Sequence, residues 1–172
     1  QDFEIPRRVT VTGAVRQHIH VFGDASEAAV GSCAYLLSEL KDGSVSVNLI
    51  AAKTKVAPSK VVTMPRLELL AAELSANLAV KVAKDLNIDG VDCTLWSDST
   101  VVLAWLSKPS SNWKIFVGNR CTGILEKFPF RQWRHVPGLE NVADHCSRGL
   151  MMSRLLMEPA WLSGPTFLHN PE

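Results

Sequence analysis

Three strand-like segments followed at once by a long amphipathic helix place the strongest constraint on how this chain can fold. Residues 18–26 (HIHVFGDAS) alternate apolar and polar side chains, and residues 31–40 and 44–57 show further strand-like patterns. The KDG at 41–43 is typical of a hairpin turn. Residues 63–87 then place leucine and valine at steps of three and four, which predicts a helix with one apolar face. We therefore expect an antiparallel meander that continues into a long helix.

The second half of the chain alternates helical and strand-like patterns. We predict strands over 91–100, ending near Asp98, and over 130–136, with helices over 101–108, 113–128 and 141–150. This order predicts one α/β domain with a five-stranded mixed sheet and helices on both faces. The first three strands are expected to be antiparallel, and the fourth and fifth to run parallel to the first. The Pro-rich segment after 150 reads as irregular.

Composition narrows the class of protein. The chain has 172 residues, 47% of them apolar and 20% charged, with a net charge of +1. These values suit one soluble domain, and any nucleic acid would have to be met by a local basic patch. The four cysteines are far apart, which predicts neither a zinc site nor a disulfide framework and suits an intracellular reducing compartment. No apolar run reaches the ~18 residues of a membrane span, so no membrane partner is expected. The start without Met suggests a piece of a longer protein.

Four acidic residues lie at unusual positions in this predicted fold. Asp24 and Asp98 end the first and fourth strands, which are natural parallel neighbours, and sites in open α/β sheets gather at the carboxyl ends of strands. Glu68 and Asp144 each lie in the first turn of a predicted helix. Taken singly, each has a structural explanation as a turn former, a helix cap or a first-turn acid. Taken together, the four predict a carboxylate cluster.

Clustered carboxylates repel one another unless a cation is present. Oxygen ligands without His or Cys suit Mg²⁺, with Mn²⁺ as a substitute. Two such ions ~3.5–4 Å apart can activate a water and stabilise the leaving oxygen in phosphodiester cleavage. The acids therefore predict a metal-dependent nuclease.

Four motifs, in this order, resemble the ribonuclease H domain of LTR-retrotransposon polyproteins, and the Bel/Pao group most of all. They are FGDAS, PRLELLAAEL, WSDSTVVLAWL and RHVPGLENVADHCSRG. LIAAKTKVAP, WKIFVGNR and WLSGPTFL are also similar to the pattern of that group, so the resemblance runs from about Ile5 to Leu168. It implies a ribonuclease H-like fold over 17–150, after a linker (1–16) from a preceding polymerase or connection region. Residues 151–172 would form a tail that packs on the domain or leaves it.

The resemblance also implies an activity and its residues. Asp24 would bridge two Mg²⁺ ions, Asp144 would help to hold the ion on the side of the nucleophilic water, and Glu68 and Asp98 would hold the ion on the leaving side. The implied reaction is hydrolysis of the RNA strand of an RNA/DNA hybrid, leaving 5′-phosphate and 3′-hydroxyl ends. It would take place in a cytoplasmic retroelement particle, beside the reverse transcriptase polymerase region of the same polyprotein.

Further residues are candidates for contact with the hybrid. Hydroxyl and basic side chains could contact its 2′-hydroxyls and phosphates: Ser26, Ser99, Lys53, Lys55, Lys60, Arg66, Arg120, Arg134 and Arg148. As an alternative, the serines are caps or turn formers and about half of the basic residues are solvated surface. The loop before the last helix holds no His, since His135 and His145 only flank it, and the basic handle of some cellular relatives is absent.

Two other functions remain open at this point. One is a catalytically weak or inactive connection module that binds nucleic acid or scaffolds the polymerase. The presence of acids at all four positions argues against this module. The other is an integrase-like strand-transfer enzyme, which would place its last acid on a long late helix. The oligomeric state is not predicted.

Overall fold

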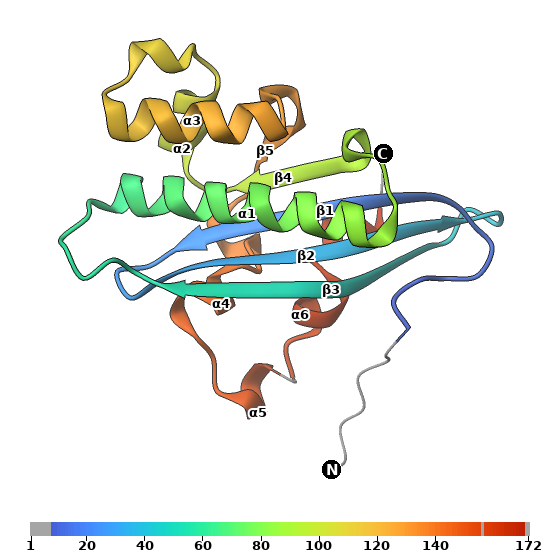
Figure 1. Ribbon diagram of the computed structural model, residues 1–172. Coiled ribbons are helices and arrows are strands. Elements are labelled where there is room, and N and C mark those ends of the chain that lie inside the picture. The colour runs from blue at the N-terminus through green and yellow to red at the C-terminus, as the bar shows by residue number, and fades with distance from the viewer. Residues whose placement is uncertain (1–7, 156, 171–172) are drawn as a thin grey trace.

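The computed structural model describes residues 8–155 and 157–170 and has one five-stranded sheet at its centre, drawn in Figure 1. The strands lie in the order β3-β2-β1-β4-β5. Their bounds are β1 Ala14–Ala25, β2 Ala29–Leu40, β3 Val45–Val56, β4 Cys93–Ser97 and β5 Trp133–His135. β1 pairs with β2 and β2 with β3 in antiparallel register, whereas β4 is parallel to both β1 and β5. The predicted fold class is thus confirmed.

Helices cover both faces of the sheet (Figure 1). One face carries α1 (Met64–Leu86), α2 (Thr100–Leu106) and α3 (Ile115–Lys127), and the other carries α4 (Asp144–Arg148) and α6 (Pro159–Ser163). α5 (Met152–Leu155) lies farther from the sheet. Because both faces are covered, β2 is buried along nearly its whole length instead of on alternate residues. In the described part of the chain, no helix has the length and apolar character needed to cross a bilayer.

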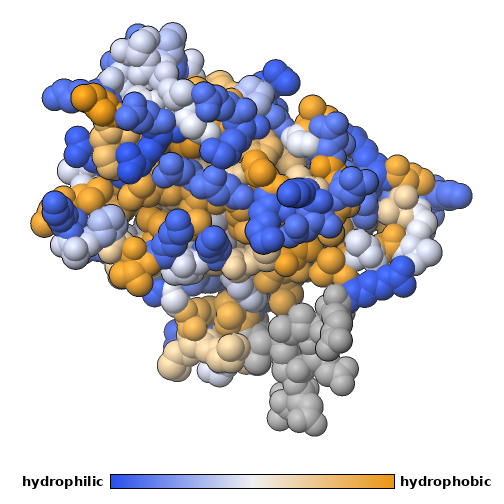
Figure 2. All heavy atoms as spheres, viewed as in Figure 1, coloured by the Kyte–Doolittle hydropathy of each residue, from blue (hydrophilic) through white to orange (hydrophobic). Residues whose placement is uncertain are grey.

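The long helix α1 forms as its sequence pattern predicts. Pro65 lies in its first turn, where a missing N–H costs nothing, and Leu67, Leu74 and Leu78 are buried against the sheet. None of its charged residues is buried, and Figure 2 shows a band of hydrophilic side chains along it. The helix ends at Asn87, whose φ of 54° is left-handed, a conformation that asparagine tolerates better than most residues. Gly90 follows just beyond the helix and begins a separate short turn (Gly90–Asp92).

The C-terminal segment has more structure than its sequence indicates. Pro159 and Pro165 each precede or begin a short helical turn, α6 and η5 (Thr166–His169). Phe167 packs against Trp96 with ring centroids 4.9 Å apart, and the Tyr35 hydroxyl donates to the carbonyl of Trp161 at 2.9 Å. The C-terminal segment is therefore part of the hydrophobic core around Tyr35 and Trp96. At the other end, β1 starts at Ala14, inside the linker expected over 1–16, and residues 1–7 of that linker lie outside the described residues.

His20 on β1 links stability to pH. Burial lowers the pKa of His20 to about 3, and the Trp96 indole N–H donates to its Nδ1 at 3.1 Å. Its ring must stay neutral in the folded state, while the unfolded chain takes up a proton below pH ~6.5. We therefore expect this side chain to lower the free energy of unfolding by about 1–2 kcal/mol between pH 7 and pH 5.

Urea unfolding of the wild type and of His20→Gln at both pH values measures this contribution. The variant should lose most of that pH dependence, and His135→Gln, at an exposed position, should keep it. Equal slopes for the wild type and His20→Gln would contradict the assignment. The difference between variants is needed because groups with raised pKa values have the opposite effect.

Candidate active site

Asp24 and Asp98 leave the sheet side by side. Gly23 pairs with Ser97 in the parallel β1–β4 ladder, so the next residue of each strand emerges at the same edge. Asp24 is only 8% exposed. Burial raises the pKa of Asp24 to about 6, with smaller contributions from the charges of Asp98 and Asp144, while a hydrogen bond from Ser147 opposes the rise. Three of the four predicted acids therefore act on one another at this edge.

Glu68 reaches the same region from α1 through a serine. The Ser99 hydroxyl donates to Glu68 Oε2 and accepts from the backbone N–H of Val102 at 3.2 Å, which makes Ser99 the N-cap of α2. Because Ser99 directly follows Asp98, this contact ties the helix that carries Glu68 to the end of β4. The alternative role of Ser99 as a helix cap is confirmed, and its one hydroxyl proton goes to Glu68.

Asp144 is the first residue of α4, which packs very closely on β2. A Cβ placed on Gly31 would lie 2.4 Å from Cys146 Cβ, so glycine is needed for this approach. The Asp144 carboxylate accepts a hydrogen bond from Arg148 Nε at 2.6 Å, one helical turn later. That bond raises the pKa of the guanidinium, with smaller contributions from the charges of Asp24 and Asp98. Arg148 is thus a counter-ion at the edge of the cluster.

The predicted hybrid contacts fall into two groups. Lys53, Lys55 and Arg66 are exposed on β3 and at the start of α1. Ser26 and Arg120 already have protein partners: the Ser26 hydroxyl donates to the carbonyl of Ser147 at 2.7 Å in a buried turn. Arg120 stacks on Phe116, with its guanidinium carbon 3.8 Å from the ring centroid. Its Nε lies 3.7 Å from Glu73 Oε2 in a salt bridge. Arg120 therefore joins α3 to α1.

Oxygen atoms dominate the donor set at this edge. Over residues 8–155 and 157–170, no three His, Cys, Asp or Glu side chains are arranged so that they could hold a metal ion by themselves. Mg²⁺ does not require such a cage, because it is usually bound through one or two carboxylates with waters and substrate phosphates. A buried carboxylate with a raised pKa, flanked by two further acids, fits that kind of ion.

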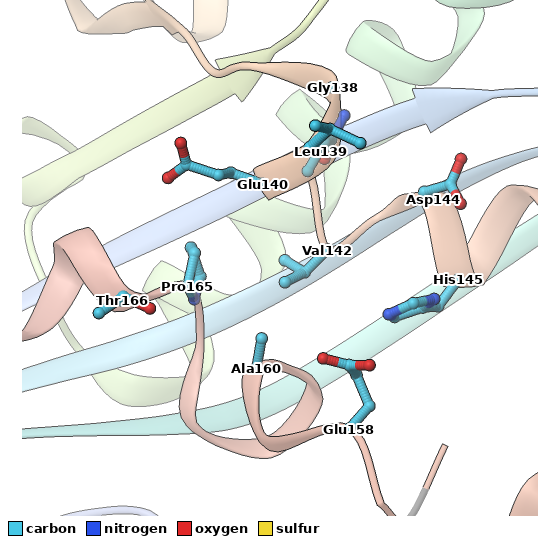
Figure 3. A pocket seen from close by; sticks show the side chains of 11 residues that line it. Gly138, Leu139, Glu140, Val142, Asp144, His145, Glu158, Ala160, Pro165 and Thr166 are labelled. Carbon is cyan, nitrogen blue, oxygen red and sulfur yellow. The ribbon is translucent and has the colours of Figure 1, made fainter. Parts of the chain in front are cut away.

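A cavity of about 460 Å³ adjoins the last acid on the side of the C-terminal segment. Figure 3 shows His145 and Glu158 facing each other across it, with Leu139 and Glu140 on the loop before α4. His145 also lies edge-on to Trp161, with centroids 6.1 Å apart. The histidine next to Asp144 is therefore packed against the C-terminal segment.

Residues 1–99 match the family of Pao retrotransposon-like RNaseH-like domains. The chain belongs to this family. The match includes Asp24, Glu68 and Asp98 and ends before Asp144. No curated protein sequence matches the chain.

Solved structures similar to this Pao-family domain include two ribonuclease H1 proteins and a viral protease-reverse transcriptase. Ribonuclease H1 of Halobacterium salinarum is 19% identical, with a TM-score of 0.46, over 77% of this chain and 94% of that one. LC11-RNase H1, from a compost metagenome and solved with an RNA/DNA hybrid, is 13% identical, with a TM-score of 0.47, over 81% and 99%. Prototype foamy virus protease-reverse transcriptase is 13% identical, with a TM-score of 0.47, over 91% of this chain and 22% of that one.

Sequence reasoning missed Ser147, Asn141 and Gly31, all of which surround the cluster. Ser147 lies three residues after Asp144, so the helical repeat could have indicated that both share one face of α4. Asn141 and Gly31 carry no comparable signal, because their partners Gly23 and Cys146 are more than 100 residues away in the sequence.

Proposed function

We propose that this domain is a metal-dependent endonuclease that hydrolyses the RNA strand of RNA/DNA hybrids during reverse transcription of a retroelement. The observation that carries the proposal is that Asp24 and Asp98 follow paired residues of the parallel strands β1 and β4. Asp24 is buried there, and the charges of Asp98 and Asp144 add to the burial that raises its pKa. Membership of the Pao family supports the same reading. We place the activity in an intracellular retroelement particle, next to the polymerase region of the same polyprotein.

Each acid has a role in this proposal. Asp24, Glu68, Asp98 and Asp144 would hold two Mg²⁺ ions, for which Mn²⁺ can substitute. When bound, these ions supply a hydroxide-like nucleophile and stabilise the leaving oxygen. Asp24, on which the charges of Asp98 and Asp144 act, would be a central ligand, while Ser99 orients Glu68 through its hydroxyl. Arg148 orients the Asp144 carboxylate through a charge-assisted hydrogen bond.

The hybrid would bind across this edge through its backbone. Lys53, Lys55 and Arg66 are exposed and form no salt bridge within residues 8–155 and 157–170, so they are our candidates for phosphate contacts, with Arg148 nearest to the acids. Arg66 also lies over the Phe116 ring, with its guanidinium carbon 5.0 Å from the centroid. The backbone at Ser26 and Ser99 would face the 2′-hydroxyls, since both hydroxyl groups already have protein partners. Arg120 contributes indirectly by fixing α3 on α1.

A cleavage assay on a hybrid with labelled RNA tests the proposal. We expect cuts with 5′-phosphate ends in the RNA strand only, in Mg²⁺ or Mn²⁺ and not in EDTA, and no cutting of duplex DNA. Asp98→Asn should lower the rate at least about a hundredfold, because it removes one charged ligand from the cluster. Asp85→Asn, in the exposed Lys81–Asp85 pair of α1, is the matched control and should cut normally.

Anisotropy measurements on the same hybrid separate binding from chemistry. Tight binding without cleavage in either metal would overturn the nuclease assignment and favour the connection module. Equal rates for Asp98→Asn and the wild type would also overturn it.

A further inference from the structure

Ser147 makes a buried contact with the central acid of the cluster. Its side chain is on α4, the residue is 3% exposed, and its hydroxyl donates to Asp24 Oδ2. The same oxygen is 3.2 Å from the carbonyl of Asp144, but a hydroxyl has a single proton to donate. The carboxylate is the stronger acceptor, so the proton of Ser147 goes to Asp24.

Two further hydrogen bonds hold Ser147 in place relative to β1. Ser26, two residues after Asp24, donates to the carbonyl of Ser147 at 2.7 Å. Asn141, just before α4, donates from Nδ2 to the carbonyl of Gly23 at 3.0 Å and accepts from the N–H of Ala143. The residues on both sides of Asp24 are therefore tied to both ends of the short helix. A five-residue helix has little stability of its own, so these bonds define where Ser147 lies.

We propose that Ser147 is a positioning residue that fixes the orientation of the Asp24 carboxylate, an inference that rests on the proposed function. The terminal torsion of an aspartate is soft, so burial alone does not select one carboxylate plane. A carboxylate has about four acceptor positions, and Ser147 fills one of them. The backbone N–H of Ala25 fills another, and the positions that remain are available at the edge where the charges of Asp98 and Asp144 act on Asp24. Ser147 thereby preorganises a ligand that has no other side-chain donor among the described residues.

Ser147→Ala tests this role. We expect kcat for hybrid cleavage to fall about ten- to a hundredfold with KM for the hybrid unchanged, as for a lost hydrogen bond to a charged group. Mn²⁺ binding to the hybrid-free protein, measured by calorimetry, should weaken about tenfold. Ser147→Thr keeps the hydroxyl and should restore both values. Ser107→Ala is the matched control, because Ser107 donates to a carbonyl three residues earlier and has no carboxylate partner.

The outcomes separate this inference from the proposed function. A wild type that binds Mn²⁺ but cuts no hybrid removes the nuclease assignment, while the calorimetry still tests Ser147. A Ser147→Ala protein with wild-type kcat and Mn²⁺ affinity overturns the positioning role alone, and a wild type that binds no Mn²⁺ overturns both. If Ser147→Ala does not fold by circular dichroism, Ser26→Ala replaces it. That variant frees the carbonyl of Ser147 and should cause a smaller loss of kcat and Mn²⁺ affinity; no loss would overturn the role.

Discussion

Asp24→Asn should abolish cleavage and, without metal, make the protein more stable at pH 8. Cleavage should fall at least about a thousandfold, because the variant loses the charge at the centre of the cluster. The gain in stability follows from the raised pKa: the folded state holds the Asp24 proton up to about pH 6, whereas the unfolded state releases it near 3.8. Ionising Asp24 in the fold therefore costs stability as pH rises from about 4 to 6, by about 1–3 kcal/mol in full.

Urea unfolding in EDTA at pH 8 and pH 4 measures that cost. The free energy of unfolding of Asp24→Asn should exceed that of the wild type by about 1–3 kcal/mol at pH 8. This difference should shrink at pH 4, where the wild-type Asp24 carboxyl is largely protonated. Asp85→Asn should differ little from the wild type, because it alters an exposed ion pair. A variant that is less stable than the wild type at pH 8, or that cuts normally, would contradict the central place given to Asp24.

Gly31→Ala should lower both the stability of the domain and its cleavage activity. The added Cβ would lie 2.4 Å from Cys146 Cβ, 2.7 Å from the Cys146 carbonyl carbon and 2.8 Å from the Ser147 N. Two of these are backbone atoms, so α4 itself would have to move away from β2. We expect a loss of about 2–4 kcal/mol in the free energy of unfolding. Cleavage should drop at least about tenfold, because Asp144 and Ser147 move with the helix.

Gly123→Ala is the matched control for this substitution. Gly123 lies inside α3, and its added Cβ would find only Lys127 Nζ at 4.0 Å. It should stabilise the domain by about 0.5–1 kcal/mol, since alanine favours helix more than glycine does. Thermal unfolding with parallel cleavage assays compares the two. If Gly31→Ala melts and cuts like the wild type, the close contact between α4 and β2 is wrong.

Sequence periodicity predicted the elements whose residues repeat along one face. The leucine spacing in α1 and the apolar–polar alternation in β1 identify these elements without knowledge of the segments that pack against them. The order of the elements then indicates that the acids at the strand ends lie close together. The helix predicted over 113–128 is shorter in the structure because Trp113, Lys114 and Phe128 have extended backbone. The strand predicted over 130–136 is shorter because a 3₁₀ turn occupies Phe130–Gln132. Whether the four acids catalyse remains a prediction.

Contacts between distant segments could not be predicted in this way. Ser26 was chosen as a hybrid contact from its place after Asp24, but its hydroxyl bonds to Ser147, 121 residues later. The sequence predicts Arg120 as a contact to the hybrid, but in the structure its guanidinium contacts Glu73 and Phe116. The turns after residue 150 depend on Tyr35 and Trp96 as packing partners, and nothing in their local sequence identifies those residues.

The packing of Phe167 also limits how far this chain can be shortened at its C-terminal end and still fold. Its ring covers Trp96 and lies 6.3 Å from Phe22, and the neighbouring Leu168 is 3% exposed. A fragment ending at residue 150, two residues after the end of α4, would leave these rings facing water. A recombinant domain, or a proteolytic boundary compatible with an intact sheet, must therefore extend past Leu168.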